Sequence, residues 1–237
     1  MNYKNLTFIA TALLIASAAH AEWHYGVGTG IGLSSYDGDL KVDDTGKLDV
    51  EFDQDDFESG FGAAGFATNG TWLFNLSGSM VEYESKDTIK GLPIGRTTNN
   101  FERTVAEFTV GYVVYDEDAI KLTPYLGINY TKHELEFKNS AYKGDLEDDW
   151  IDGVFGLNVD YTINDEWTWN NSAEYSVGDS EGCFGVKTGV SWKFAENWIA
   201  GAYISFESDE FEGSDGGSDF DYDSDITTFG LTLAYTW

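Results

Sequence analysis

The chain has 237 residues, with 42 aspartate and glutamate residues against 13 lysine and arginine residues, for a formal net charge of -29. This excess of acid excludes nucleic acid as a partner, because affinity for nucleic acid depends on basic side chains that neutralise phosphates. Aromatic residues make up 16% of the chain and only two residues are proline, which excludes a disordered acidic chain. The single cysteine, Cys183, excludes a fold held by internal disulfides.

The N-terminal residues have the pattern of a secretory signal peptide. Lys4 precedes an apolar stretch over residues 6–18, and the letters AHA at 19–21 form a small-residue cleavage motif. The apolar stretch is shorter than the roughly 20 residues that a membrane-spanning helix needs. We therefore expect a signal peptide, 1–21, followed by one exported domain, 22–237.

The exported domain alternates apolar and polar residues at a period of two, which is typical of β-strands with two different faces. About ten such segments follow one another. Their approximate ranges are 23–34, 57–68, 72–80, 103–114, 122–131, 151–161, 167–177, 184–194, 198–206 and 228–237. The second segment is ambiguous, because Phe61 and Phe66 fall on opposite faces unless a bulge intervenes.

The connections between these segments alternate in length. Short turns such as TNGT and NDE alternate with longer, mostly acidic segments near 36–56, 86–100, 138–149 and 207–225. Most alternating segments reach the roughly 9 to 11 residues that a strand needs to cross hydrocarbon. This pattern predicts an all-β fold, an antiparallel transmembrane β-barrel of ten strands, with eight or twelve as alternatives. The barrel would have short periplasmic turns and long acidic outer loops.

Two hairpin-like segments carry a family resemblance. VDYTINDEWTWNNSAEYSVG and GVSWKFAENWIAGAYISF each join a strand, a tight acidic turn and a return strand led by an aromatic residue. With the signal-like N-terminus, the chain resembles the small, porin-like outer-membrane β-barrel proteins of Gram-negative bacteria. The resemblance implies a monomer in the cell outer membrane that contacts membrane lipid and lipopolysaccharide, and it names no particular activity.

The last segment, TFGLTLAYTW, ends on an aromatic residue. In a closed barrel the last strand pairs with the first, so we expect this segment to form the closing seam. Members of the resembled family end in an aromatic residue that the outer-membrane assembly machinery reads as an insertion signal. The resemblance implies that role for Leu231, Leu233, Tyr235 and Trp237.

The strand faces assigned to the lumen carry charges of both signs. These lumen residues are Arg103, Glu107, Asp152, Asp160, Glu174, Lys187 and Lys193. Interior side chains nearly fill a barrel of this size, so the charges can pair and block the lumen. The alternative is a small selective pore, and the predicted role is therefore structural or one of passive permeation. A secreted acidic β-sandwich that binds a ligand is a second alternative.

We find no catalytic motif, and the sequence predicts a protein that is not an enzyme. The alternative is a surface hydrolase with His133 as its base, with Glu134 and Glu136 nearby in TKHELEF. A general base needs a partner within hydrogen-bond reach, and no serine or paired-aspartate motif stands beside His133. We expect His133 to be a histidine of the barrel rim and Cys183 to be an incidental thiol.

Two predicted outer loops hold 19 of the 42 carboxylates. Crowded carboxylates repel one another, and Ca²⁺ is their natural neutraliser because it prefers oxygen ligands. The candidate calcium ligands alternate in sequence and would share one strand face: Asp219, Asp221, Asp223 and Asp225. The alternative is a solvated anionic surface, and no other cofactor is expected.

Overall fold

The computed structural model describes residues 22–42, 48–86, 96–139, 143–215 and 218–237. The predicted signal peptide therefore lies outside the described residues. In the described part of the chain, no helix is long and apolar enough to cross a bilayer.

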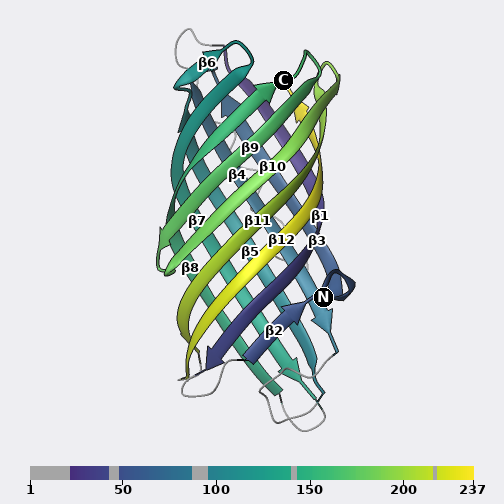
Figure 1. Cartoon of the computed structure of the whole chain (residues 1–237), viewed down its shortest axis with the longest axis vertical. Helices are drawn as coiled ribbons and strands as arrows, with labels where there is room; N and C mark the ends of the chain where they lie inside the picture. The colour runs from purple at the N-terminus through teal and green to yellow at the C-terminus, as the bar shows by residue number, and fades with distance from the viewer. Residues whose placement is uncertain (1–21, 43–47, 87–95, 140–142, 216–217) are drawn as a thin grey trace.

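Ten antiparallel strands of the described chain close into a barrel (Figure 1). They are β1 (His24–Val42), β3 (Phe57–Thr68), β4 (Trp72–Ser85), β5 (Thr98–Tyr112), β7 (Ile120–Lys138), β8 (Lys143–Thr162), β9 (Trp167–Gly178), β10 (Gly182–Ala195), β11 (Trp198–Asp215) and β12 (Ser218–Thr236). The barrel closes because β12 pairs with β1, from Gly26 opposite Thr236 to Val42 opposite Phe220. The predicted ten-stranded barrel is confirmed, and the β-sandwich alternative is excluded because the sheet closes on itself.

Two short strands and one helical turn extend this barrel. β2 (Leu48–Phe52) pairs with the end of β1, and β6 (Tyr115–Glu117) pairs with β7. The helical turn η1 (Gln54–Asp56) joins β2 to β3 along the same side of β1. Figure 1 shows β2 at one end of the barrel, and β6 with the C-terminus at the other.

The short turns lie at the end with β6 and the C-terminus, which is therefore the periplasmic end. An asparagine side chain closes two of these turns. The Oδ1 atom of Asn69 accepts from the backbone N–H groups of Thr71 and Trp72, at 3.1 and 2.8 Å. Gly70 between them has φ +81°, a left-handed conformation that glycine adopts without strain. Asn164 accepts in the same way from the N–H groups two and three residues on.

An apolar belt covers the outside of the barrel. It consists of exposed large side chains on every barrel strand, such as Ile31, Leu126 and Leu231 at 64, 67 and 59% exposure. Tryptophan side chains gather at the periplasmic edge of this belt, where an indole can meet both lipid and headgroups. The exposed ones are Trp72, Trp167, Trp169, Trp192, Trp198 and Trp237.

On the outer side of the apolar belt, the apolar residues of the strands change from the outward face to the inward face. Along β1, Ile31 and Leu33 point outward and are exposed, whereas Tyr36 and Leu40 further on point inward and are buried. The outward position beside Tyr36 is Asp37. Because successive side chains alternate, the strand keeps its register while the apolar face moves from outside to inside. The outer half is thus built like a water-soluble barrel, with an apolar interior and a polar exterior.

Strand length shows how far this outer half reaches. β8 has 20 residues, which at roughly 3.3 Å each and a tilt of about 40° span roughly 50 Å along the barrel axis. The apolar belt of such a barrel is only about 25 Å tall. About half of β8 therefore stands outside the hydrocarbon, and the predicted long loops at 36–56 and 207–225 are largely strands. The ambiguous β3 has its register shift near its start, between Phe57 and Ser59, and not between Phe61 and Phe66.

Candidate functional site: the lumen and its outer plug

An apolar cluster fills the lumen above the membrane belt. We call this cluster the outer plug: Tyr36, Leu40, Val50, Phe52, Tyr83, Phe101, Leu135, Phe137, Trp150, Phe211, Phe220, Tyr222 and Ile226. Its rings pack closely, with 4.5 Å between the centroids of Tyr36 and Phe101 and 4.1 Å between those of Trp150 and Phe211. Such aromatic pairs contribute about 0.5–1.5 kcal/mol each beyond the area that they bury. The outer plug is the hydrophobic core of the described chain.

His133, on β7, lies inside the outer plug. Its ring meets four aromatic rings edge to face, with centroids 5.0–5.9 Å away, and only 6% of the residue is exposed. Burial lowers the pKa of His133 well below its ordinary value, and the nearby positive charge of Arg103 lowers it further. His133 is therefore a neutral core residue, and it is not at the rim as the sequence suggested.

The acids near His133 in sequence do not share its environment. Glu134 pairs with Lys132, and Glu136 pairs with Lys143 at 3.4 Å. Both glutamates occupy the alternate positions of β7, so they point away from His133. The structure does not bring a carboxylate dyad of TKHELEF together with this histidine.

Arg103 lies at the inner border of the outer plug. Its Nη2 atom donates to carboxylate oxygens of Glu207 and Asp209, both at 3.0 Å. The side chains of Arg103 and Asp209 are only 12 and 4% exposed, so this is a buried ion pair. The sequence placed Glu207 and Asp209 in an outer loop, and it gave no signal for this contact because β5 and β11 are not neighbours in the sheet.

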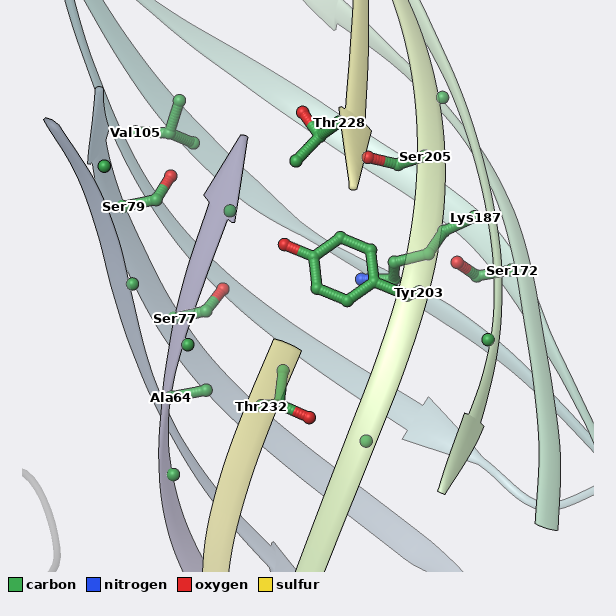
Figure 2. A pocket seen from close by; sticks show the side chains of 18 of the residues that line it. Ala64, Ser77, Ser79, Val105, Ser172, Lys187, Tyr203, Ser205, Thr228 and Thr232 are labelled. Carbon is green, nitrogen blue, oxygen red and sulfur yellow. The ribbon is translucent and has the colours of Figure 1, made fainter. Parts of the chain in front are cut away.

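A cavity of about 550 Å³ occupies the lumen below the outer plug. One wall is made of small residues, among them Ala64, Ser77 and Ser79, and Lys187 and Tyr203 project from the other side (Figure 2). The Nζ atom of Lys187 lies 5.7 Å from the centre of the Tyr203 ring. Tyr203 fits because Gly230 on the next strand leaves room, since a Cβ there would overlap the ring.

The predicted lumen residues do not all line the cavity. Arg103, Glu107, Asp160, Glu174 and Lys187 line the cavity. Asp152 is buried and accepts from the backbone N–H of Ser180 at 3.0 Å, whereas Lys193 is exposed. Two of these carboxylates bind neutral donors: the hydroxyl of Tyr125 donates to Glu174 at 2.7 Å, and the amide of Asn170 donates to Asp160 at 2.8 Å.

Comparison with known proteins rests on structure alone. No family model matches the sequence, and a search of curated proteins finds no match either. The outer membrane protease OmpT from Escherichia coli superposes with a TM-score of 0.59 at 11% identity, covering 90% of this chain and 97% of that one. The outer membrane protein OprG from Pseudomonas aeruginosa gives 0.49 at 14% identity, covering 92 and 97%. The translocator domain of NalP from Neisseria meningitidis gives 0.49 at 12%, covering 89 and 88%.

The chain has the fold of a Gram-negative outer-membrane β-barrel. The superposition on OmpT at this identity shows the fold, and the apolar belt with its tryptophan edge fits a bilayer. The expected location in the cell outer membrane follows from the fold and the belt together. The family resemblance drawn from the two hairpin segments is confirmed at the level of the fold.

The closing seam of this barrel contains the predicted assembly signal. Leu231, Leu233 and Tyr235 point outward from β12, and Trp237 exchanges two backbone hydrogen bonds of 3.0 Å with Tyr25. The ring of Trp237 also stacks on Tyr25, with 6.1 Å between the centroids. Recognition by the assembly machinery stays a prediction.

The outer half of the barrel, beyond the apolar belt, is called the extension from here on. Its outer surface is acidic. Its exposed carboxylates include Asp37, Glu51, Glu82, Asp145, Glu147, Asp149, Glu210, Glu212, Asp221, Asp223 and Asp225. Asp221, Asp223 and Asp225 share the outward face of β12 as expected, while the side chain of Asp219 lies outside the described part. Among the described residues no three His, Cys, Asp or Glu side chains are grouped to hold a metal ion. The calcium site stays a prediction, and Cys183 is a half-buried free thiol.

Proposed function

We propose that this protein is a closed, non-enzymatic outer-membrane barrel that holds an acidic β-barrel extension above the membrane. Its role is structural, and the outer plug is the observation that carries the proposal. A conducting pore needs a continuous polar path, whereas tightly packed rings cross the lumen here between the cavity and the outside. The proposal therefore favours the structural alternative over passive permeation at neutral pH.

The acidic extension is the part that meets the surroundings of the cell. Its strands carry carboxylates outward and bury aromatic side chains inward, so it is stable in water without further cover. Its negative charge opposes the approach of polyanions and favours cations. Contact with lipopolysaccharide and a monomeric state belong to this proposal, as does the absence of catalysis, which the burial of His133 supports.

Single-channel recording in planar bilayers tests the closed state. We expect no conductance from the wild-type protein near neutral pH. Phe101→Ala removes a ring of the outer plug that is only 2% exposed, and we expect channel events from this variant. Phe108→Ala is the matched control, because Phe108 lies on the same strand but faces lipid at 42% exposure. Steady conductance from the wild-type protein, or equal behaviour of the two variants, would contradict the proposal.

A further inference from the structure

The outer plug contains polar atoms that its packing leaves without partners. In the described part of the chain, three buried side-chain atoms without a hydrogen-bond partner are Tyr36 Oη, Arg103 Nε and His133 Nε2. Buried polar groups are normally paired, so a group of orphaned atoms in one place calls for an explanation. All three belong to the outer plug or to residues beside it. The closure is therefore dense in apolar contacts but incomplete in its hydrogen bonds.

His133 is the titratable residue at the centre of the outer plug. Arg103 lies directly opposite it on β5, Asp148 lies opposite it on β8, and Tyr222 contacts it from β12. Asp209 on β11 neutralises part of the charge of Arg103, together with Glu207. His133 and Asp148 also border a void of about 20 Å³, which is large enough for one water molecule.

Protonation of His133 would put a second positive charge beside Arg103 within a cage of aromatic rings. Loss of hydration and repulsion by Arg103 oppose it, and their sum is the lowered pKa of His133. In an opened lumen the imidazole would be hydrated and would have an ordinary pKa, so the open state binds the proton more tightly. Acid therefore favours opening, starting as the pH falls below about 6.5.

We propose that the outer plug opens when His133 is protonated, so that the barrel becomes an acid-activated pore for small cations. This inference rests on the proposed closed state and adds an activity to it. The permeant class follows from the cavity, whose charged lining residues are Arg103 and Lys187 against Glu107, Asp160, Glu174 and Glu207. Arg103 is already bound to Glu207, so Asp160 and Glu174 outnumber Lys187 even where Glu107 is protonated, and this excess of carboxylates attracts cations.

The test is single-channel recording in potassium chloride between neutral and acidic pH. We expect the wild-type protein to be silent near pH 7 and to open on acidification, with the open-to-closed ratio rising at most about tenfold per pH unit because one proton is taken up. With a potassium chloride gradient across the bilayer, the reversal potential should shift toward the equilibrium potential of potassium. His133→Phe keeps a ring in the cage without a titrating group, and we expect it to stay silent at both pH values. His133→Lys should conduct near pH 7.

His24→Phe is the matched control, because His24 is exposed at the start of β1 and lies far along the strand from the outer plug. We expect its acid response to equal that of the wild-type protein. Acid opening that persists in His133→Phe, or a wild-type protein that stays silent in acid, overturns the inference and leaves the closed barrel standing. Wild-type conductance near neutral pH overturns the closed barrel itself. A mobility shift on heating in gels confirms that each variant is folded before it is recorded.

Discussion

Replacing Arg103 with methionine tests the buried ion pair beneath the outer plug. The substitution keeps most of the side-chain volume but leaves the carboxylates of Glu207 and Asp209 facing each other without their cation. Breaking a buried pair by removing one partner typically costs 3–5 kcal/mol, and we expect a loss of about 4 kcal/mol in the free energy of unfolding near neutral pH. The loose pair of Lys121 and Asp116, at 3.6 Å and largely exposed, provides a control. Lys121→Met should cost under about 1 kcal/mol.

The pH dependence of the Arg103→Met loss identifies its electrostatic cause. Burial raises the pKa of Asp209, and Arg103 acts against that rise. When an acidic side chain has a higher pKa in the folded state than in the unfolded state, its contribution to the free energy of unfolding falls as the pH rises. Removing Arg103 raises the folded-state pKa further, so the variant should lose stability more steeply than the wild-type protein between about pH 4 and pH 7.

The assay is urea unfolding in lipid vesicles, followed by tryptophan fluorescence. We expect the gap between variant and wild type to shrink near pH 4, where the orphaned carboxylates are protonated and no longer repel each other. A gap of the same size at both pH values would refute the electrostatic reasoning and would point to lost packing instead.

Two further predictions concern the seam and the cavity wall. Gly230→Val should destabilise the barrel by about 1–3 kcal/mol, because the valine side chain would overlap the ring of Tyr203. Adding Tyr203→Ala should restore part of this loss in urea titrations. Strictly additive losses in the double variant would argue against the contact. Deleting Trp237 removes its two hydrogen bonds to Tyr25 and should lower the fraction of protein assembled in the outer membrane, as measured by the heat-dependent gel shift; unchanged assembly would contradict the predicted role of this residue.

The membrane half of the fold could be predicted from the sequence because lipid imposes a simple rule on it. Outward positions are mostly apolar, so the alternation around Phe229 and Leu231 assigns both the strand and its faces. The turns could be predicted for a similar reason. Asn69 and Gly70 form a local turn motif that needs no information from the rest of the chain.

The outer half was not predicted because its apolar residues stand on the opposite face and among many acids. Phe220 and Tyr222 alternate with Asp221 and Asp223, which is a strand pattern, but the density of carboxylates suggested a loop. The exchange of faces along β1, from Leu33 outward to Tyr36 inward, was the available signal for the outer plug. The position of His133 in the outer plug could be recognised only once that exchange was known.

The ion pair of Arg103 could not be predicted from local pattern. Its partner carboxylates, Glu207 and Asp209, are 104 and 106 residues away in sequence and meet it across the lumen. Such a contact depends on the curvature of the closed barrel and on which side chains share a level. Neither is encoded in the period of a single strand.

The uninterrupted course of the strands has a consequence for how the acidic surface is presented. Strands such as β7 and β8 run from the lipid belt to the extension without a linker, and they stay paired along their whole length. Within its described strands the extension therefore has no hinge, and its orientation to the bilayer is fixed by the tilt of the barrel. Anything that binds this surface meets a rigid scaffold standing on the membrane, at a constant height and angle, and not a swinging arm.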